Sequence, residues 1–180
     1  MSGWLDVLDG KSDLLLLKND APHDKMTEML KLADIAVYSP DNRLQLVAEV
    51  KAKTGATKEW AAELRRNLVA HSAIPPAQFF LLATPEYFYL WKDGSESLET
   101  RVPDAVADAR HIIDPYIENT RITLEQISDS SLQLILTSWL SLLANSTLTP
   151  ESVPPSEKWL FDSGLYEAIR HGSIEAEAAS

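Results

Sequence analysis

Apolar and polar residues alternate along residues 44–53, and this period of two predicts a β-strand. One face of the strand would carry Leu44, Leu46, Ala48 and Val50, and the other Gln45, Val47, Glu49, Lys51 and Lys53. Residues 33–38, with β-branched Ile35 and Val37, predict a preceding strand, and residues 39–42 (Ser-Pro-Asp-Asn) have the composition of a turn. The two strands are therefore expected to form a hairpin.

The pattern on either side of this hairpin predicts helices and further strands. Helices are expected over residues 24–32 and over residues 57–72, where apolar residues recur at helical spacing. Residues 78–83 are almost all apolar, as in a strand at the centre of a sheet, and residues 87–91 return as another strand. This order predicts an α/β fold with a mixed central sheet of about four or five strands flanked by helices.

The C-terminal half has a helical pattern. Helices are expected over residues 104–113, over residues 124–145 with Thr123 and Gln126 as a capping box, and over residues 156–171 closed by Gly172. Leucines and a tryptophan between residues 132 and 143 surround most of the second of these helices, which predicts either burial on several sides or a homodimer contact. Residues 173–180 are expected to be a frayed tail.

Length and composition narrow the interpretation. The chain has 180 residues, so a single domain over residues 1–172 is expected, with a core over residues 24–91 and a helical part over residues 104–172. The net charge of −11 argues against a protein that coats nucleic acid or membranes non-specifically. The segment over residues 43–70 differs from the whole chain in the sign of its charge, because its six basic residues outnumber its three acidic ones. Cysteine is absent, and no segment resembles a signal peptide or a membrane span, so a cytoplasmic location is expected.

The hairpin brings together residues that can carry out chemistry. Strand alternation places Glu49 and Lys51 on one face, and the hairpin can bring Asp34 opposite them. Two carboxylates and an ammonium group are the groups that Mg²⁺-dependent hydrolysis of a phosphodiester requires, because the carboxylates hold the cation and the ammonium stabilises developing charge. The simpler interpretation is a salt bridge between Glu49 and Lys51 on an exposed sheet face.

With Asp34, the triplet Glu49-Val50-Lys51, the following helix and the apolar strand at 78–83, the chain resembles the PD-(D/E)XK nucleases, the restriction-endonuclease-like superfamily. The resemblance covers residues 24–91. It implies that Asp34 and Glu49 bind Mg²⁺, for which Mn²⁺ can substitute, that Lys51 is the catalytic lysine, and that Glu28 is an additional metal ligand. The chain departs from the family in two places: Ala33 stands where the motif has proline, and the next helix lacks a glutamine-tyrosine motif.

The resemblance implies a Mg²⁺-dependent DNA endonuclease, in a restriction or repair system. One alternative is a catalytically inactive protein of the same fold that acts as an interaction or regulatory subunit, and another is an unrelated α/β domain with no active site. For the endonuclease, Lys53, Arg65 and Arg66 are candidates for contacts with DNA phosphates. A solvated strand end for Lys53 and a solvated helix face for the two arginines are the competing interpretations.

Overall fold

The computed structural model describes residues 33–71, 74–92 and 100–177. Glu28 and the helix expected over residues 24–32 lie outside these ranges, so the prediction of an additional metal ligand at Glu28 is not addressed by the structure.

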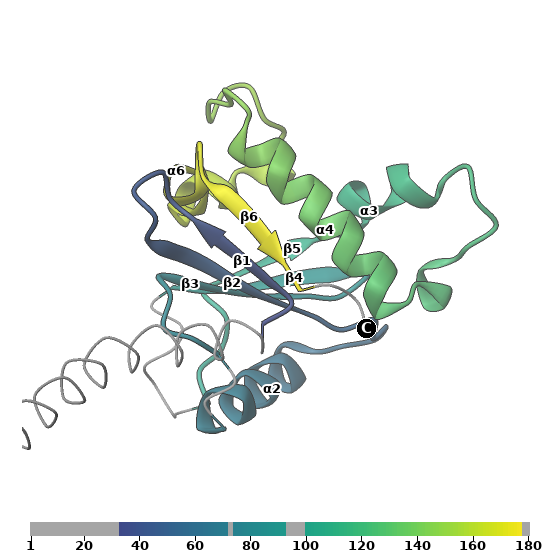
Figure 1. Cartoon of the computed structure of the whole chain (residues 1–180). Coiled ribbons are helices and arrows are strands. Elements are labelled where there is room, and N and C mark those ends of the chain that lie inside the picture. Colours follow the sequence, from purple (N-terminus) through teal and green to yellow (C-terminus); the bar gives the residue numbers. More distant parts are fainter. Residues whose placement is uncertain (1–32, 72–73, 93–99, 178–180) are drawn as a thin grey trace, which may run out of the picture.

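A six-stranded mixed sheet forms the centre of the molecule (Figure 1). Its strand order is β5-β4-β3-β2-β1-β6. The strands are β1 (Ile35–Tyr38), β2 (Leu44–Val50), β3 (Phe79–Ala83), β4 (Tyr87–Lys92), β5 (Ala105–Asp108) and β6 (Ser173–Ala176). Strands β2 and β3 run parallel and every other neighbouring pair is antiparallel. The predicted α/β class with a mixed sheet is therefore confirmed, although the sheet has six strands rather than four or five.

Helices cover both faces of this sheet. On one face lies α2 (Lys58–Ala70), which begins at the N-cap Thr57 and connects the parallel strands β2 and β3. The other face is covered by α4 (Asp129–Ala144) together with α3 (Arg110–Ile117), α5 (Trp159–Asp162) and α6 (Leu165–Ile169), as Figure 1 shows. Two short 3₁₀ turns, η1 (Leu124–Gln126) and η2 (Pro155–Glu157), precede α4 and α5. The predicted capping box at Thr123 and Gln126 is present, but it caps η1, and α4 has its own N-cap, Ser128.

Three predictions for the C-terminal half are wrong. The segment read as a helix over residues 104–113 begins with strand β5, in which Ala107 is buried and Val106 is exposed, and only then enters α3. The helix expected over residues 156–171 is divided into η2, α5 and α6, with Gly164 in the left-handed conformation (φ 84°) between the last two. The first half of the tail expected to be frayed over residues 173–180 forms β6, which pairs with β1.

A glycine is required where the chain enters β6. A Cβ atom built on Gly172 would lie 2.2 Å from the carbonyl oxygen of Tyr38 and 2.8 Å from that of Ile169. Both neighbours are backbone atoms, which cannot move aside as a flexible side chain would. The close approach of Gly172 to β1 therefore allows β6 to pair along this strand.

The register of the hairpin is interrupted once. Val37 pairs with Leu46 but Tyr38 pairs with Leu44, so β2 has one extra residue, Gln45, at this point. Because of this bulge, Leu44 packs against the cluster on the α2 side, whereas Leu46, Ala48 and Val50 face the α4 side. The alternation predicted that Leu44, Leu46, Ala48 and Val50 share one face. This prediction is right for the last three residues and wrong for Leu44.

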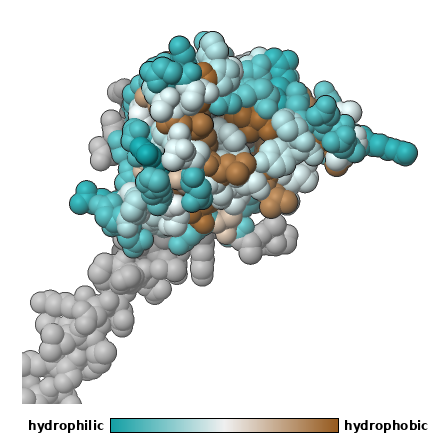
Figure 2. Space-filling view, turned by 90° about the horizontal axis from the view of Figure 1, so that it is seen from above, coloured by the Kyte–Doolittle hydropathy of each residue, from teal (hydrophilic) through white to brown (hydrophobic). Residues whose placement is uncertain are grey.

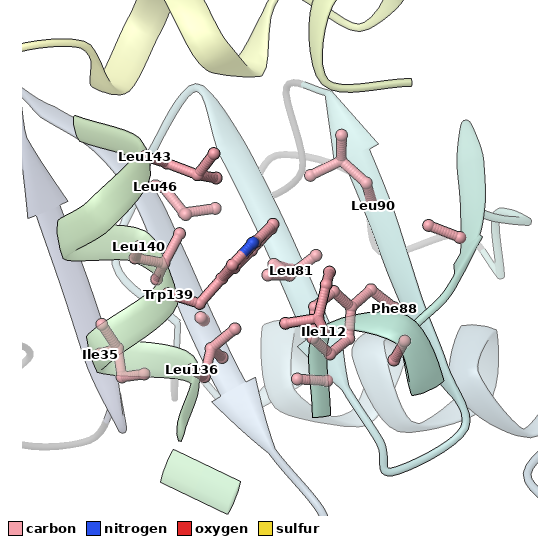
Figure 3. Close-up of a cluster of buried hydrophobic side chains, with 14 of the residues drawn as sticks. Ile35, Leu46, Leu81, Phe88, Leu90, Ile112, Leu136, Trp139, Leu140 and Leu143 are labelled. Atoms are coloured by element: carbon pink, nitrogen blue, oxygen red, sulfur yellow. The ribbon is translucent and has the colours of Figure 1, made fainter. Parts of the chain in front are cut away.

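The larger core lies between the sheet and α4 (Figure 3). Trp139 lies over the middle of the sheet, and Leu136, Leu140 and Leu143 pack beside it. Leu134 and Leu142 on the same helix are 69% and 66% exposed, so α4 is buried along one side rather than all round. Figure 2 views this side of the molecule from outside and shows hydrophobic patches among polar surface.

Candidate functional site

The pairing of β1 with β2 brings Asp34 near Glu49. Asp34 directly precedes β1, whose first residue, Ile35, pairs with Ala48, and the negative charge of Asp34 acts on Glu49. The Asp34 carboxylate is also anchored to β2, because its Oδ2 accepts a hydrogen bond of 2.7 Å from the backbone N–H of Val50. The structure thus brings together the two carboxylates that the sequence pattern predicted to converge.

Lys51 completes the predicted group. Its ammonium Nζ donates to Glu49 Oε1 at 2.6 Å, and its backbone N–H donates to the carbonyl oxygen of Ala83 at 3.0 Å, one position beyond the last residue of β2. The Lys51 side chain is 36% exposed and that of Glu49 is 12% exposed. The lysine is therefore accessible from solvent, whereas most of the glutamate is covered.

The electrostatics of this group follow from its partial burial. Burial raises the pKa of Glu49, and the negative charges of Asp34 and Asp129 raise it further, while the Lys51 ammonium opposes them. For Lys51, burial alone would lower the pKa, but its contact with Glu49 and the nearby charges of Asp34 and Asp129 outweigh burial and raise the pKa. Lys51 consequently stays charged at neutral pH, and a positive charge beside Glu49 favours the ionised carboxylate.

Asp129 is a member of this neighbourhood that the sequence reasoning missed. It is the first residue of α4, and its Oδ1 accepts a hydrogen bond of 2.6 Å from the backbone N–H of Ala52. In the sequence, Asp129 has only the pattern of an acidic residue in the first turn of a helix, which is common and indicates no contact with a distant strand. Only the folding of α4 against the sheet brings Asp129 to the end of β2.

The segment after Lys51 is held at two further points. The backbone N–H of Gly55, which has a φ of 66°, donates to Glu86 Oε2 at 2.6 Å. The Tyr89 hydroxyl donates to the carbonyl oxygen of Ala56 at 2.9 Å. Together with Ala52, these contacts fix the connection between β2 and α2 to the β3–β4 turn, to β4 and to α4.

The three predicted DNA contacts lie in different environments. Lys53 is exposed, with its Nζ 5.5 Å from the centre of the Trp60 ring, and Arg66 on α2 is also exposed. The placement of Arg65 on a solvated helix face is wrong: its side chain is 0% exposed and its guanidinium lies 5.7 Å from the centre of the Trp91 ring. Aromatic packing and the interior of the α2 side enclose Arg65, so it offers no surface to a phosphate.

The groups that could bind a metal ion are Asp34 and Glu49. Each uses one oxygen in the contacts above, and within the described part of the chain no hydrogen bond uses Asp34 Oδ1 or Glu49 Oε2. Among residues 33–71, 74–92 and 100–177, no three His, Cys, Asp or Glu side chains form a group that could hold a metal ion. A cation here would therefore take two protein ligands and complete its shell with water, as Mg²⁺ commonly does.

Comparisons with protein-family models, with curated proteins and with solved structures found no match for this chain. In the part of the chain that the structure describes, no helix is long and apolar enough to cross a membrane.

Proposed function

We propose that this protein is a Mg²⁺-dependent DNA endonuclease that hydrolyses phosphodiester bonds at the site formed by Asp34, Glu49 and Lys51. The observation that carries the proposal is the gathering of three groups at the end of β2: the Asp34 carboxylate accepts from the Val50 N–H at 2.7 Å, and the Lys51 ammonium lies 2.6 Å from Glu49. The resemblance to the PD-(D/E)XK nucleases supports it, since Asp34 directly precedes β1, Glu49 lies on β2 with Lys51 just beyond its end, and a helix then leads to the parallel strand β3. On this basis we assign the chain a restriction-endonuclease-like fold.

The donor set fits a hard divalent cation. Two carboxylates with one uncommitted oxygen each suit Mg²⁺ or Mn²⁺. Burial and, to a smaller extent, the charge of Asp34 raise the pKa of Glu49, and a cation between the two carboxylates would offset both effects. When bound, such a cation would offset charge on the scissile phosphate and lower the pKa of a water molecule. Asp34 is kept in place for this role by its hydrogen bond to Val50.

Lys51 supplies the positive charge of the site. Its pKa is raised, so its ammonium is present across the physiological range, and its partial exposure allows it to reach a phosphate oxygen or a water molecule. An ammonium that is already positioned by Glu49 stabilises negative charge as it develops in the transition state. Removal of the Lys51 side chain should therefore reduce the rate more than the affinity for DNA.

DNA would approach across the surface that carries Lys53 and Arg66. Both side chains are exposed, and they belong to the segment in which basic residues outnumber acidic ones. The rest of the chain is acidic, so few phosphate contacts are expected and binding should be weak at physiological salt.

A catalytically inactive subunit of the same fold is the second candidate. Two observations favour it. Lys51 and Glu49 already form a salt bridge with each other, and the described residues contain no group of three side chains that could hold a metal ion. In such a protein, the exposed Leu134 and Leu142 on α4 would lie on an interaction surface, such as a homodimer contact through the C-terminal helices.

Metal binding and DNA cleavage separate the two candidates. The full chain would be titrated with Mn²⁺ and incubated with supercoiled and linear DNA in Mg²⁺, Mn²⁺ or Ca²⁺. We expect Mn²⁺ binding that is lost in Asp34→Asn, and Mg²⁺- or Mn²⁺-dependent nicking that falls about 100- to 1000-fold in Lys51→Ala. Lys158→Ala, an exposed lysine near α5, is the control and should cleave normally. Absence of cleavage by the wild type on every DNA form and metal would favour the inactive subunit.

A further inference from the structure

Asp129 holds a strand end that lies far from it in the sequence. Its Oδ1 accepts from Ala52 N–H at 2.6 Å across 77 positions of sequence, and Ala52 is the residue directly after Lys51. The α4 N-terminus does not need this carboxylate as a cap, because the Ser128 hydroxyl already accepts from the Ser131 N–H. The carboxylate is therefore directed to the end of β2 instead of to its own helix.

The contact lies where the chain leaves the sheet. Strand β2 ends at Val50, and the Lys53 N–H donates to the Lys51 carbonyl oxygen at 2.7 Å, so the backbone turns at Ala52. Asp34 accepts from the Val50 N–H and Asp129 accepts from the Ala52 N–H. The amides on either side of Lys51 in the sequence are thus both bound by carboxylates.

We propose that Asp129 is a positioning residue for Lys51: by binding the Ala52 amide, it fixes the backbone from which the lysine side chain extends and so keeps the ammonium at Glu49. This inference rests on the proposed nuclease function. It also gives α4, which packs on the opposite face of the sheet, a direct connection to the site. A lysine displaced by about 1 Å from its productive position can lower the rate about 100-fold.

Glu86 provides a matched control within the same connection. Its Oε2 accepts from the Gly55 N–H at 2.6 Å, so it forms the same kind of bond, of the same length, a few residues beyond Lys51. If a carboxylate on this segment mattered only for its general rigidity, loss of Glu86 would have the same effect as loss of Asp129. If the bond matters because Ala52 is next to Lys51, loss of the Asp129 carboxylate will lower the rate of cleavage and loss of the Glu86 carboxylate will not.

The test compares the wild type with Asp129→Ala, Asp129→Asn and Glu86→Ala in steady-state DNA cleavage, with Mn²⁺ affinity and melting temperature measured on the same samples. We expect Asp129→Ala to lower kcat about 10- to 100-fold while KM and Mn²⁺ affinity stay within about twofold. Asp129→Asn keeps an oxygen that can accept from Ala52 and should restore kcat to within about threefold of wild type. Glu86→Ala should stay within about twofold.

Each contrary result has a distinct meaning. If the wild type cleaves DNA and Asp129→Ala has the same kcat, the inference is overturned and the nuclease proposal stays intact. An equal loss in Glu86→Ala, or an Asn variant as slow as the Ala variant, would also overturn positioning through the Ala52 bond. A wild type that cleaves no DNA would refute the nuclease proposal and this inference together. If Asp129→Ala does not fold, Asp129→Leu, which is similar in size and has no hydrogen-bond acceptor, takes its place in the comparison with Asp129→Asn.

Discussion

The two faces of the sheet are built differently. The α4 face is a continuous apolar layer to which α3, α4, α5 and α6 all contribute. On the α2 face, α2 is the one helix within the described residues, and this face encloses the charged Arg65 beside the Trp91 ring and carries Glu49 and Lys51 at the end of β2. Among residues 33–71, 74–92 and 100–177, the α4 face therefore supplies most of the apolar burial, and the α2 face holds charged groups where β2 ends.

Two leucines of α4, two positions apart, test how much the apolar layer contributes. Leu140 is 0% exposed and Leu142 is 66% exposed. Leu140→Ala should lower the free energy of unfolding by about 2–5 kcal/mol, since it removes buried methyl groups and leaves a cavity, whereas Leu142→Ala should change it by less than about 0.5 kcal/mol. Urea denaturation of both variants measures the difference. A large loss in Leu142→Ala would mean that this residue is covered in solution, as in a homodimer.

Two neighbouring arginines on α2 test whether a buried charged side chain on the α2 face contributes to the stability of the fold. Arg65→Ala should destabilise the protein by roughly 1–3 kcal/mol, because a fully buried side chain that packs over Trp91 is lost. Arg66→Ala should leave the free energy of unfolding within about 0.5 kcal/mol, since its side chain is exposed. Thermal denaturation followed by circular dichroism distinguishes them. Equal stability of the two variants would show that Arg65 contributes no packing.

The exposed cations on the α2 side should affect DNA affinity and leave folding unchanged. Replacing Lys53 and Arg66 together by alanine should weaken binding about equally on all DNA sequences and reduce the slope of log affinity against log salt by about 2. Fluorescence anisotropy with two unrelated duplexes over a range of salt concentrations measures both effects, with Lys158→Ala as the control. Binding that persists unchanged in the double variant would place the DNA surface elsewhere.

The smallest effect is expected from a polar contact between the end of β5 and the start of α3. The Arg110 guanidinium, which donates to both carboxylate oxygens of Asp108, holds the pKa of Asp108 below its ordinary value of 3.8, as does the Arg110 backbone N–H. A lowered pKa stabilises the fold above pH 3.8, and this stabilisation disappears as pH falls through the folded-state pKa. Asp108 is 41% exposed, so Asp108→Asn should cost less than about 1 kcal/mol at pH 7.

The pH dependence provides the check on Asp108. The difference in unfolding free energy between wild type and Asp108→Asn should shrink as the pH falls below 3.8, the ordinary pKa of Asp108. Urea denaturation at several pH values measures it. In an Arg110→Ala background the same substitution should have a smaller effect at pH 7, and an undiminished effect there would rule out Arg110 as the cause.

The convergence of Asp34, Glu49 and Lys51 could be predicted because it depends on short-range rules. A period of two sets which side chains share a face, and a short turn sets which residues lie opposite one another. The bulge at Gln45 falls near the turn, so it alters the placement of Leu44 and leaves the register at Glu49 intact. These residues would converge on any hairpin with this register.

The remaining features depend on contacts between distant segments. The helix pattern treated Arg65 as a surface charge, whereas its burial depends on residues from distant segments, such as Trp91 of β4, whose ring lies beside the guanidinium. Strand β6 has a composition of serine, isoleucine, glutamate and alanine with no strong strand preference, and it forms because β1 offers an edge to pair with. Asp129 contacts Ala52 only after α4 has packed against the sheet, and no pattern of neighbouring residues in the sequence indicates this contact.

The pairing of β6 with β1 also has a consequence for synthesis of the chain. These strands lie about 140 residues apart, and a ribosome adding roughly 5–20 residues per second needs about 7–28 s to cover that distance. During that interval the edge of β1, next to Asp34, emerges before its partner and exposes unpaired backbone groups that can bind other chains. We therefore expect a higher yield of folded protein under conditions that limit contacts between nascent chains, such as low temperature or the presence of a chaperone that binds extended segments.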